Sequence, residues 1–168
     1  MGFVLLADEV LAAPAASMSV SVDTAYRMFR VTVYGINTTR QNMQLRLNGD
    51  TGANYAKQTV SASSTSVQGE RTTGATGIFP YPEASYAIGL DEPFLFTFEI
   101  SKPLTSTPAR IVSSGSWMDE PGGTPPAVVH YASTVAEWNN TADLISSISL
   151  TIGINFAIGT RIVIEGAE

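Results

Sequence analysis

The stretch Phe94-Leu-Phe-Thr-Phe-Glu-Ile100 decides the fold, because a large aromatic or branched apolar residue recurs in it at every second position. Successive side chains of a β-strand point to opposite faces, so this period of two places the large residues on one buried face. Met43-Gln-Leu-Arg-Leu47 alternates in the same way. Val, Ile, Phe, Tyr and Thr dominate the repeating positions elsewhere in the chain, and these residues suit a pleated surface. The sequence therefore predicts an all-β protein.

The same pattern predicts about eight strands in two packed antiparallel sheets. Separations of about a dozen or more residues between strands favour connections that cross between the sheets, as in a jelly roll, over a meander of tight hairpins. A lectin-like sandwich or an immunoglobulin-type Greek key is the alternative. Only the short stretch Ala132–Trp138 has some helical character. The expected strands are Met18–Val22, Tyr26–Tyr34, Met43–Leu47, Phe94–Ile100, Ala109–Ser113, Val128–Ser133, Ile145–Ile152 and Arg161–Ile164.

The length of 168 residues suits one compact domain. We assign residues 18–168 to a single jelly-roll-type antiparallel β-sandwich and residues 1–17 to an N-terminal arm or edge strand. Two segments rich in small polar residues, Gly and Pro, Ser61–Tyr86 and Met118–Pro126, are predicted to be long excursions from the sandwich. Loops of that length usually carry function or assembly contacts.

The composition excludes several classes of protein. The chain has no cysteine, so disulfides, thiolate nucleophiles and cysteine-based metal centres are impossible. Nine basic and fifteen acidic residues give a net charge of -6, whereas a nucleic-acid binder needs a concentrated positive field. No apolar run reaches the ~18 residues that a membrane-spanning helix needs. We therefore expect neither a nucleic acid nor a membrane as a partner.

The acidic residues and the single histidine give little support for catalysis. His130 has no recognisable partner for a triad or a metal site in the sequence. The acidic pairs Asp8-Glu9, Asp91-Glu92 and Asp119-Glu120 are adjacent residues, which point to opposite faces of a strand, and two of the pairs adjoin proline in expected turns. We predict that the protein is not an enzyme, that it has no cofactor, and that His130 is a structural strand residue.

The stretch Asn48-Gly-Asp-Thr-Gly-Ala-Asn54 resembles the start of a calcium loop, because oxygen-bearing residues stand two or four positions apart. The twelfth position from Asn48 is Thr59, however, where an EF-hand needs a bidentate Glu. Asn48 and Asp50 suit the capping of backbone N–H groups, and the glycines suit positive φ. A cation site is the alternative. We predict a structural turn formed by Asn48, Asp50, Gly52 and Asn54.

Several motifs together resemble a group of small structural proteins of tailed bacteriophages. In that group a strand ends in an L-R-x-N-x-D-x-G-x-N-Y turn, and the chain closes with N-F-x-x-G-[ST]-x-I-x-[IL]-x-G. The resemblance covers most of the chain except its middle, and Glu165 stands where aromatic residues are common in the group. The matching stretches are Tyr26-Arg-Met-Phe-Arg-Val-Thr-Val33, Leu45-Arg-Leu-Asn-Gly-Asp-Thr-Gly-Ala-Asn-Tyr55, Ile145-Ser-Ser-Ile-Ser-Leu150 and Asn155-Phe-Ala-Ile-Gly-Thr-Arg-Ile-Val-Ile-Glu-Gly166.

The resemblance implies a single jelly-roll domain and a place in the virion. Related small jelly rolls act as trimeric cement or decoration proteins on capsids, and others of similar build occur on tail fibres. We therefore expect a homotrimer on the capsid surface that binds the major capsid protein and stabilises contacts between its subunits. The alternative is a tail-fibre or receptor-binding module that binds host glycan.

The apolar N-terminal segment Phe3–Ala16 suits pairing with the sheet edge of a neighbouring subunit. The tryptophans and several tyrosines suit subunit contacts or, in the alternative, a platform on which sugars stack. For the glycan platform we consider Trp117, Trp138, Tyr81, Tyr86 and Tyr131. The residues predicted to contact a second subunit or the capsid are Phe3, Val4, Leu5, Leu6, Tyr81 and Trp117.

Overall fold

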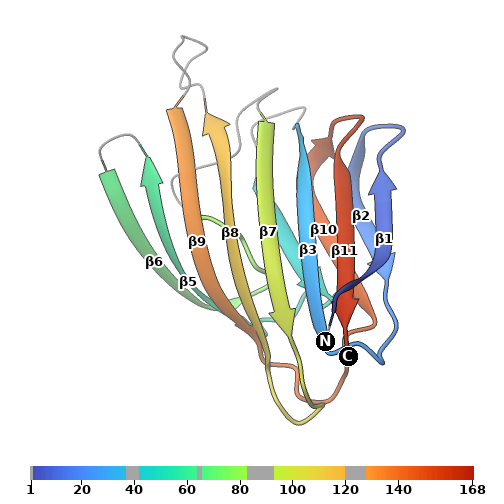
Figure 1. Ribbon diagram of the computed structural model, residues 1–168. Helices are drawn as coiled ribbons and strands as arrows, with labels where there is room; N and C mark the ends of the chain where they lie inside the picture. The colour runs from blue at the N-terminus through green and yellow to red at the C-terminus, as the bar shows by residue number, and fades with distance from the viewer. Residues whose placement is uncertain (1, 37–41, 64–65, 83–92, 120–127) are drawn as a thin grey trace.

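The computed structural model describes residues 2–36, 42–63, 66–82, 93–119 and 128–168, and no helix occurs among them. Eleven strands make up this part of the chain (Figure 1). They are β1 (Val4–Val10), β2 (Ala15–Ser21), β3 (Met28–Ile36), β4 (Met43–Leu47), β5 (Tyr55–Ser63), β6 (Ser66–Ala75), β7 (Pro93–Ser101), β8 (Ala109–Asp119), β9 (Val128–Trp138), β10 (Ser147–Phe156) and β11 (Arg161–Ala167).

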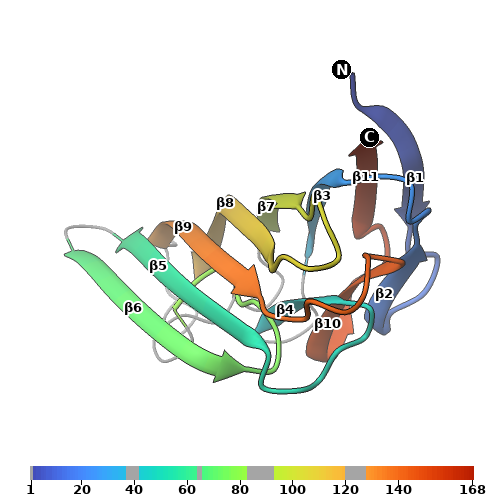
Figure 2. The same cartoon turned by 90° about the horizontal axis from the view of Figure 1, so that it is seen from below.

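The strands form two sheets of unequal width. The large sheet has the order β1-β11-β3-β7-β8-β9-β5-β6, and the small sheet has the order β2-β10-β4. All pairs are antiparallel. Figure 2 shows the small sheet under one part of the large sheet, with β5 and β6 lying beyond it. The predicted all-β antiparallel sandwich is confirmed.

The order of the strands along the chain is that of a jelly roll. From β1 to β4 the chain changes sheet at every strand, and it changes again between β10 and β11. β11 lies between β1 and β3 in the large sheet, and β10 lies between β2 and β4 in the small sheet. A bridge between Leu45 and Ile78 adds a short segment beside β4, and β7 lies beside β3. Eight segments therefore form the two four-stranded layers of a jelly roll.

Four further strands widen the large sheet. β8 and β9 continue it from β7, and the hairpin of β5 and β6 continues it from β9. We call β8, β9, β5 and β6 the extension. The inner face of the large sheet is the one that faces the small sheet, and the outer face is the opposite one.

Alternation of side chains builds the core between the sheets. Every second residue of β3, β4 and β7 is buried, as the sequence predicts. Full burial of each such side chain contributes roughly 1.5–3 kcal/mol of hydrophobic stabilisation. Gln44, predicted on the exposed side of β4, is also buried, because Gly77 lies against its side chain. Core side chains that are at most 1% exposed include Phe29, Val31, Val33, Leu45, Leu47, Phe96, Phe98, Ile100, Ile148, Leu150, Ile162 and Ile164.

The structure differs from the sequence prediction in the extension. The expected excursion Ser61–Tyr86 contains the end of β5 and the whole of β6. Ala132–Trp138, the one stretch with some helical character in the sequence, is part of β9, in agreement with the all-β prediction. β6 is rich in Thr, Gly and polar residues and has no apolar alternation. Only its antiparallel pairing with β5 identifies it as a strand. Residues 83–86, Asp91-Glu92 and residues 120–126 of the second excursion lie outside the described residues.

The N-terminal segment pairs within its own chain. β1 runs antiparallel to β11, from Val4 opposite Gly166 to Val10 opposite Arg161. The Arg161 guanidinium binds the Asp8 carboxylate across this pair. The segment that we expected to pair with a neighbouring subunit is thus an edge strand of its own sheet. β2 begins at Ala15, so the expected boundary between residues 17 and 18 falls inside β2.

We predict that Gly115→Ala destabilises the fold, because a Cβ atom at Gly115 would overlap the ring of Phe96 and the carbonyl of Leu95. Such overpacking costs about 1–3 kcal/mol of the free energy of unfolding, measured by urea denaturation. Gly69→Ala is the matched control, because the nearest atom to its added Cβ would be 3.9 Å away. Equal stability of the two variants would contradict this packing.

Candidate functional site

The turn after β4 is closed by its own side chains. Asn48 and Gly49 have φ angles of 54° and 62°, which belong to the left-handed region. Asp50 accepts hydrogen bonds from the Gly52 N–H at 2.8 Å through Oδ1 and from Asn54 Nδ2 at 2.9 Å through Oδ2. The structure thus joins Asp50, Gly52 and Asn54 of the predicted turn by hydrogen bonds, with Asn48 in the left-handed conformation at the start of the same turn.

The same turn holds distant parts of the chain. Asn48 Nδ2 donates to the Leu144 carbonyl at 2.8 Å, and Asn48 Oδ1 accepts from the Ser146 N–H at 2.8 Å. Trp138 Nε1 donates to Asp50 Oδ2 at 2.7 Å. N–H donors therefore face both oxygens of Asp50, which is the environment of a carboxylate in a structural turn. No group of three His, Cys, Asp or Glu residues suited to a metal ion occurs in the described part of the chain.

The environment of Asp50 sets the direction of its pKa. Burial alone would raise the pKa of this carboxyl. Hydrogen bonds from Trp138, Asn54 and Gly52 favour the charged form and together outweigh burial, so the pKa lies below its ordinary value. Folding therefore favours the ionised Asp50.

Lys102 lies on the other side of Trp138, and its ammonium is 5.4 Å from the indole ring. Its Nζ donates to the carbonyl oxygens of Thr107 at 2.7 Å and Asn140 at 2.8 Å. Burial lowers the pKa of Lys102, and the nearby Asp143 opposes this shift. Trp138 thus joins the connections that follow β4, β7 and β9 at one end of the sandwich. Sequence reasoning missed Lys102, because its partners are backbone carbonyls without a motif.

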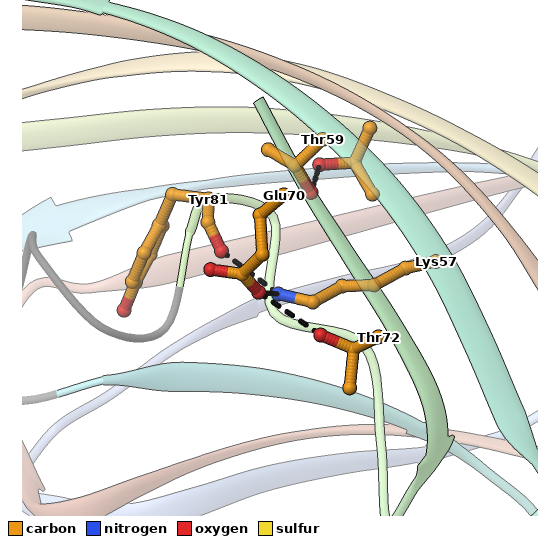
Figure 3. Close-up of polar contacts among 6 residues, drawn as sticks. Lys57, Thr59, Glu70, Thr72 and Tyr81 are labelled. Carbon is orange, nitrogen blue, oxygen red and sulfur yellow. Dashed lines mark hydrogen bonds and ion pairs between the residues drawn. The ribbon is translucent and has the colours of Figure 1, made fainter. Parts of the chain in front are cut away.

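A second buried lysine lies on the inner face of the extension (Figure 3). Lys57 Nζ is 3.2 Å from Glu70 Oε1 and donates to the Tyr81 carbonyl at 3.0 Å. Thr72 Oγ1 donates to the same Glu70 oxygen at 3.0 Å, and the Phe79 ring lies 5.2 Å from the ammonium. This cluster fastens the segment after β6 to β5 and β6. It acts as a structural clamp that neither periodicity nor spacing in the sequence indicates.

Hydroxyl groups continue this polar layer along β5. Thr59 Oγ1 and Thr134 Oγ1 are 2.9 Å apart, and both residues are buried. In the neighbouring strand β8, Ser113 lies opposite Thr134 and is also buried. The inner face thus changes from apolar in β3 and β7 to largely polar in β5, with β9 contributing both apolar and polar side chains.

The structure corrects the prediction that Tyr81 and Trp117 contact a second subunit or the capsid. Their exposed fractions are 0% and 1%, and their ring centroids are 5.0 Å apart in the core. Phe96 and His130 both stack on Trp117, with ring centroids 5.8 Å and 5.0 Å from that of the indole. Burial raises the pKa of the Tyr81 hydroxyl above its ordinary value, against the hydrogen bond with Met43 N–H. Composition alone did not distinguish these core aromatics from exposed ones.

The other predicted contact residues lie at the edge formed by β1. Val4 and Leu5 are 48% and 63% exposed, whereas Leu6 packs against the core. Phe3 is half-buried, and its ring centroid is 4.5 Å from the guanidinium carbon of Arg30. Among the six residues, Val4 and Leu5 are thus the ones with exposed side chains.

The aromatic residues considered for sugar binding do not gather at one surface. Trp117, Trp138 and Tyr81 are buried, and Tyr86 lies outside the described residues. Tyr131 is 53% exposed on the outer face of β9. It lies on a surface that sequence reasoning missed, the outer face of the extension, whose exposed large side chains are Val60, Val67, Val112, Val129, Tyr131 and Val135.

Comparison with protein-family models, with curated proteins and with solved structures finds no match to this chain. In the described residues, no helix is long and apolar enough to cross a membrane.

We predict that Asp50→Asn lowers the free energy of unfolding by about 1.5–3 kcal/mol at pH 7, because the turn loses a charged acceptor. The folded state depresses the pKa of Asp50. The contribution of the ionised Asp50 to the free energy of unfolding is therefore fully present above pH 3.8, the ordinary pKa, and is lost as the pH falls through the lower pKa of the folded state. Urea denaturation should therefore show the difference between wild type and variant shrinking below about pH 4. Glu9→Gln, at an exposed position of β1, is the control. A difference that does not change with pH would contradict the account.

We predict that Glu70→Met costs about 1–3 kcal/mol, because the buried Lys57 ammonium loses its carboxylate. The double variant Lys57→Met with Glu70→Met removes both charges and should be more stable than Glu70→Met alone. Urea denaturation of the set provides the measurement. Additive losses in the double variant would show that the pair is not coupled.

Proposed function

We propose that this protein is a structural component of a bacteriophage particle, bound to the capsid surface as a cement protein. There it would bridge neighbouring major capsid subunits and stabilise the contacts between them. The observation that carries the proposal is the broad outer face of the eight-stranded sheet, which offers area for binding. The bacteriophage-like motifs support it, because they form the turn after β4 and the closing strands β10 and β11.

The engagement of three charged groups, one partly exposed and two buried, also supports binding over chemistry. Asp50, Lys57 and Lys102 each hold a connection between strands through hydrogen bonds. A general acid or base must instead reach a substrate proton. These three charged groups thus maintain the shape of the sandwich.

A cement protein needs modest contacts repeated many times. Each copy would bind weakly across a boundary between capsid subunits, and simultaneous contacts raise the overall affinity through effective concentration. Charged residues make up only 14% of the chain, and a protein with so few charges suits such broad interfaces. The clamps at Trp138 and Lys57 would keep this surface rigid, so little binding energy is lost in ordering it.

A second candidate, a tail-fibre or receptor-binding module for host glycan, is favoured by Tyr131. Its exposed ring on the outer face of β9 offers an apolar surface on which a sugar stacks. Binding of a glycan in an array, abolished by Tyr131→Ala, would support this candidate. An array without a ligand would count against it.

We predict that the protein is present in many copies on heads and not on tails, as counted by quantitative mass spectrometry of separated heads and tails. Heads assembled without it should burst at a lower temperature or a milder osmotic shock, because subunit contacts would lack their bridge. A few copies on tails would favour the receptor-binding candidate. Absence from both fractions would contradict a role in the particle.

A further inference from the structure

The two halves of the outer face differ in character. Over the jelly-roll strands the charges are paired, with Arg30 3.5 Å from Glu99 and 3.7 Å from Glu165. Over the extension the surface is rich in valine, and Val135 and Val60 are 58% and 57% exposed. Exposed apolar side chains gathered on one face mark an interaction surface more often than scattered ones do.

Strand register shows that these side chains form one patch. Val135 on β9 lies between Val112 on β8 and Gln58 on β5. Ser133, two positions before Val135 on β9, lies opposite Val60 on β5. Val112 and Val135 are directly opposed, whereas Val60 is a diagonal neighbour of Val135, roughly 7–8 Å away, so the valines of three strands lie within one patch that also contains Gln58 and Ser133.

The charged residues of the patch have no partner in the described structure. Arg71, Arg110 and Glu137 make no ion pair and no side-chain hydrogen bond with any residue in the described ranges. Arg110 and Glu137 lie opposite each other in the register of β8 and β9. Both signs of charge therefore occur side by side on a surface where exposed valines alternate with polar side chains such as Gln58 and Ser133.

Two hollows of about 500 and 360 Å³ lie over β5 within this patch. Both are lined by Gln58, Arg71 and Val135. Gly69 lies opposite Val60 and has no side chain to fill the first hollow. The surface thus offers projecting valines beside open hollows that are large enough for several side chains.

We propose that the outer face of the extension binds a second copy of this chain, face to face about a two-fold axis. A two-fold contact brings the same patch of both copies together, so the Arg110 of each copy can pair with the Glu137 of the other. The valines of one copy enter the recesses of its partner, as inner side chains do between packed sheets. The contact buries apolar surface that a free subunit leaves in water.

Charge complementarity singles out this face for self-association. The chain carries a net charge of -6, so two copies repel each other on average. On the patch, Arg71 and Arg110 accompany Glu137, and the local charge is not acidic. A contact between unlike patches would need a second complementary surface, whereas the rest of the outer face already pairs its arginines with Glu99, Glu165 and Asp8.

The inference concerns the free protein and does not depend on the capsid role. It also differs from the homotrimer that the bacteriophage resemblance implies, so the mass of the assembly separates the two. The experiment is sedimentation equilibrium of the full chain over a range of concentrations. We expect a dimer, and a species that stays monomeric or forms a trimer would overturn the proposal.

Val135→Lys places a charge in the centre of the patch and should weaken dimerisation by about 100-fold. Val10→Lys is the matched control, because Val10 is equally exposed, at 58%, but lies on β1 at the other edge of the sheet. It should leave the dimer unchanged. Circular dichroism and cooperative unfolding check that both variants fold. A dimer of equal strength in Val135→Lys would overturn the proposal.

An exchange of charges tests whether the contact joins two copies. Arg110→Glu makes both members of the pair acidic, and Glu137→Arg makes both basic, so each variant alone should dissociate. An equimolar mixture should form a heterodimer, because an acidic patch then meets a basic one. Failure of the mixture to associate, with both variants folded and monomeric, would contradict the pairing of Arg110 with Glu137 across the axis.

Discussion

The unequal width of the two sheets is the constraint on which the rest of the structure depends. Three strands and one short bridge cannot cover the inner face of eight strands, so the large apolar side chains of the core give way to polar ones toward β5 and β6. Each buried polar group needs a partner. The hydroxyl pair of Thr59 and Thr134 and the ion pair of Lys57 and Glu70 meet that need for these four residues. Polar contacts therefore hold much of β5 and β6, whereas apolar packing that includes Trp117, Ala132 and Trp138 joins β8 and β9 to the jelly roll.

The jelly-roll half of the molecule thus provides stability, and the extension provides a surface for contacts. The jelly-roll half buries its apolar residues and pairs its surface charges, as Arg30 and Arg161 show. Trp138, held between Asp50 and Lys102, fixes the long connections that a jelly roll requires. The extension leaves valines and charges such as Glu137 open on its outer face. A stable scaffold thus presents an added surface, which is the arrangement that a protein acting by contact needs.

The sequence predicts the parts of the fold that follow local rules. Alternation in β3, β4 and β7 identifies strands and their buried faces, and the Asn48–Asn54 turn follows from the preferences of Asn, Asp and Gly. β6 is not predicted, because its sequence has no apolar alternation. Its pairing with β5 makes it a strand. Lys57 and Tyr81 are 24 residues apart, so nothing local indicates their contact or the burial of the Tyr81 ring. The outer patch is likewise visible only after the register places Val112 opposite Val135 and Val60 diagonally beside Val135.

The central claim is that the protein acts through a broad surface on the shell of a bacteriophage head. Cryo-electron microscopy of intact heads tests it most directly, because a β-sandwich of this size has a recognisable outline at subnanometre detail. The account predicts density for the sandwich at the boundaries between major capsid subunits, in contact with at least two of them. Heads whose outer and inner surfaces carry no such density, or density for the sandwich found on the tail alone, would contradict it.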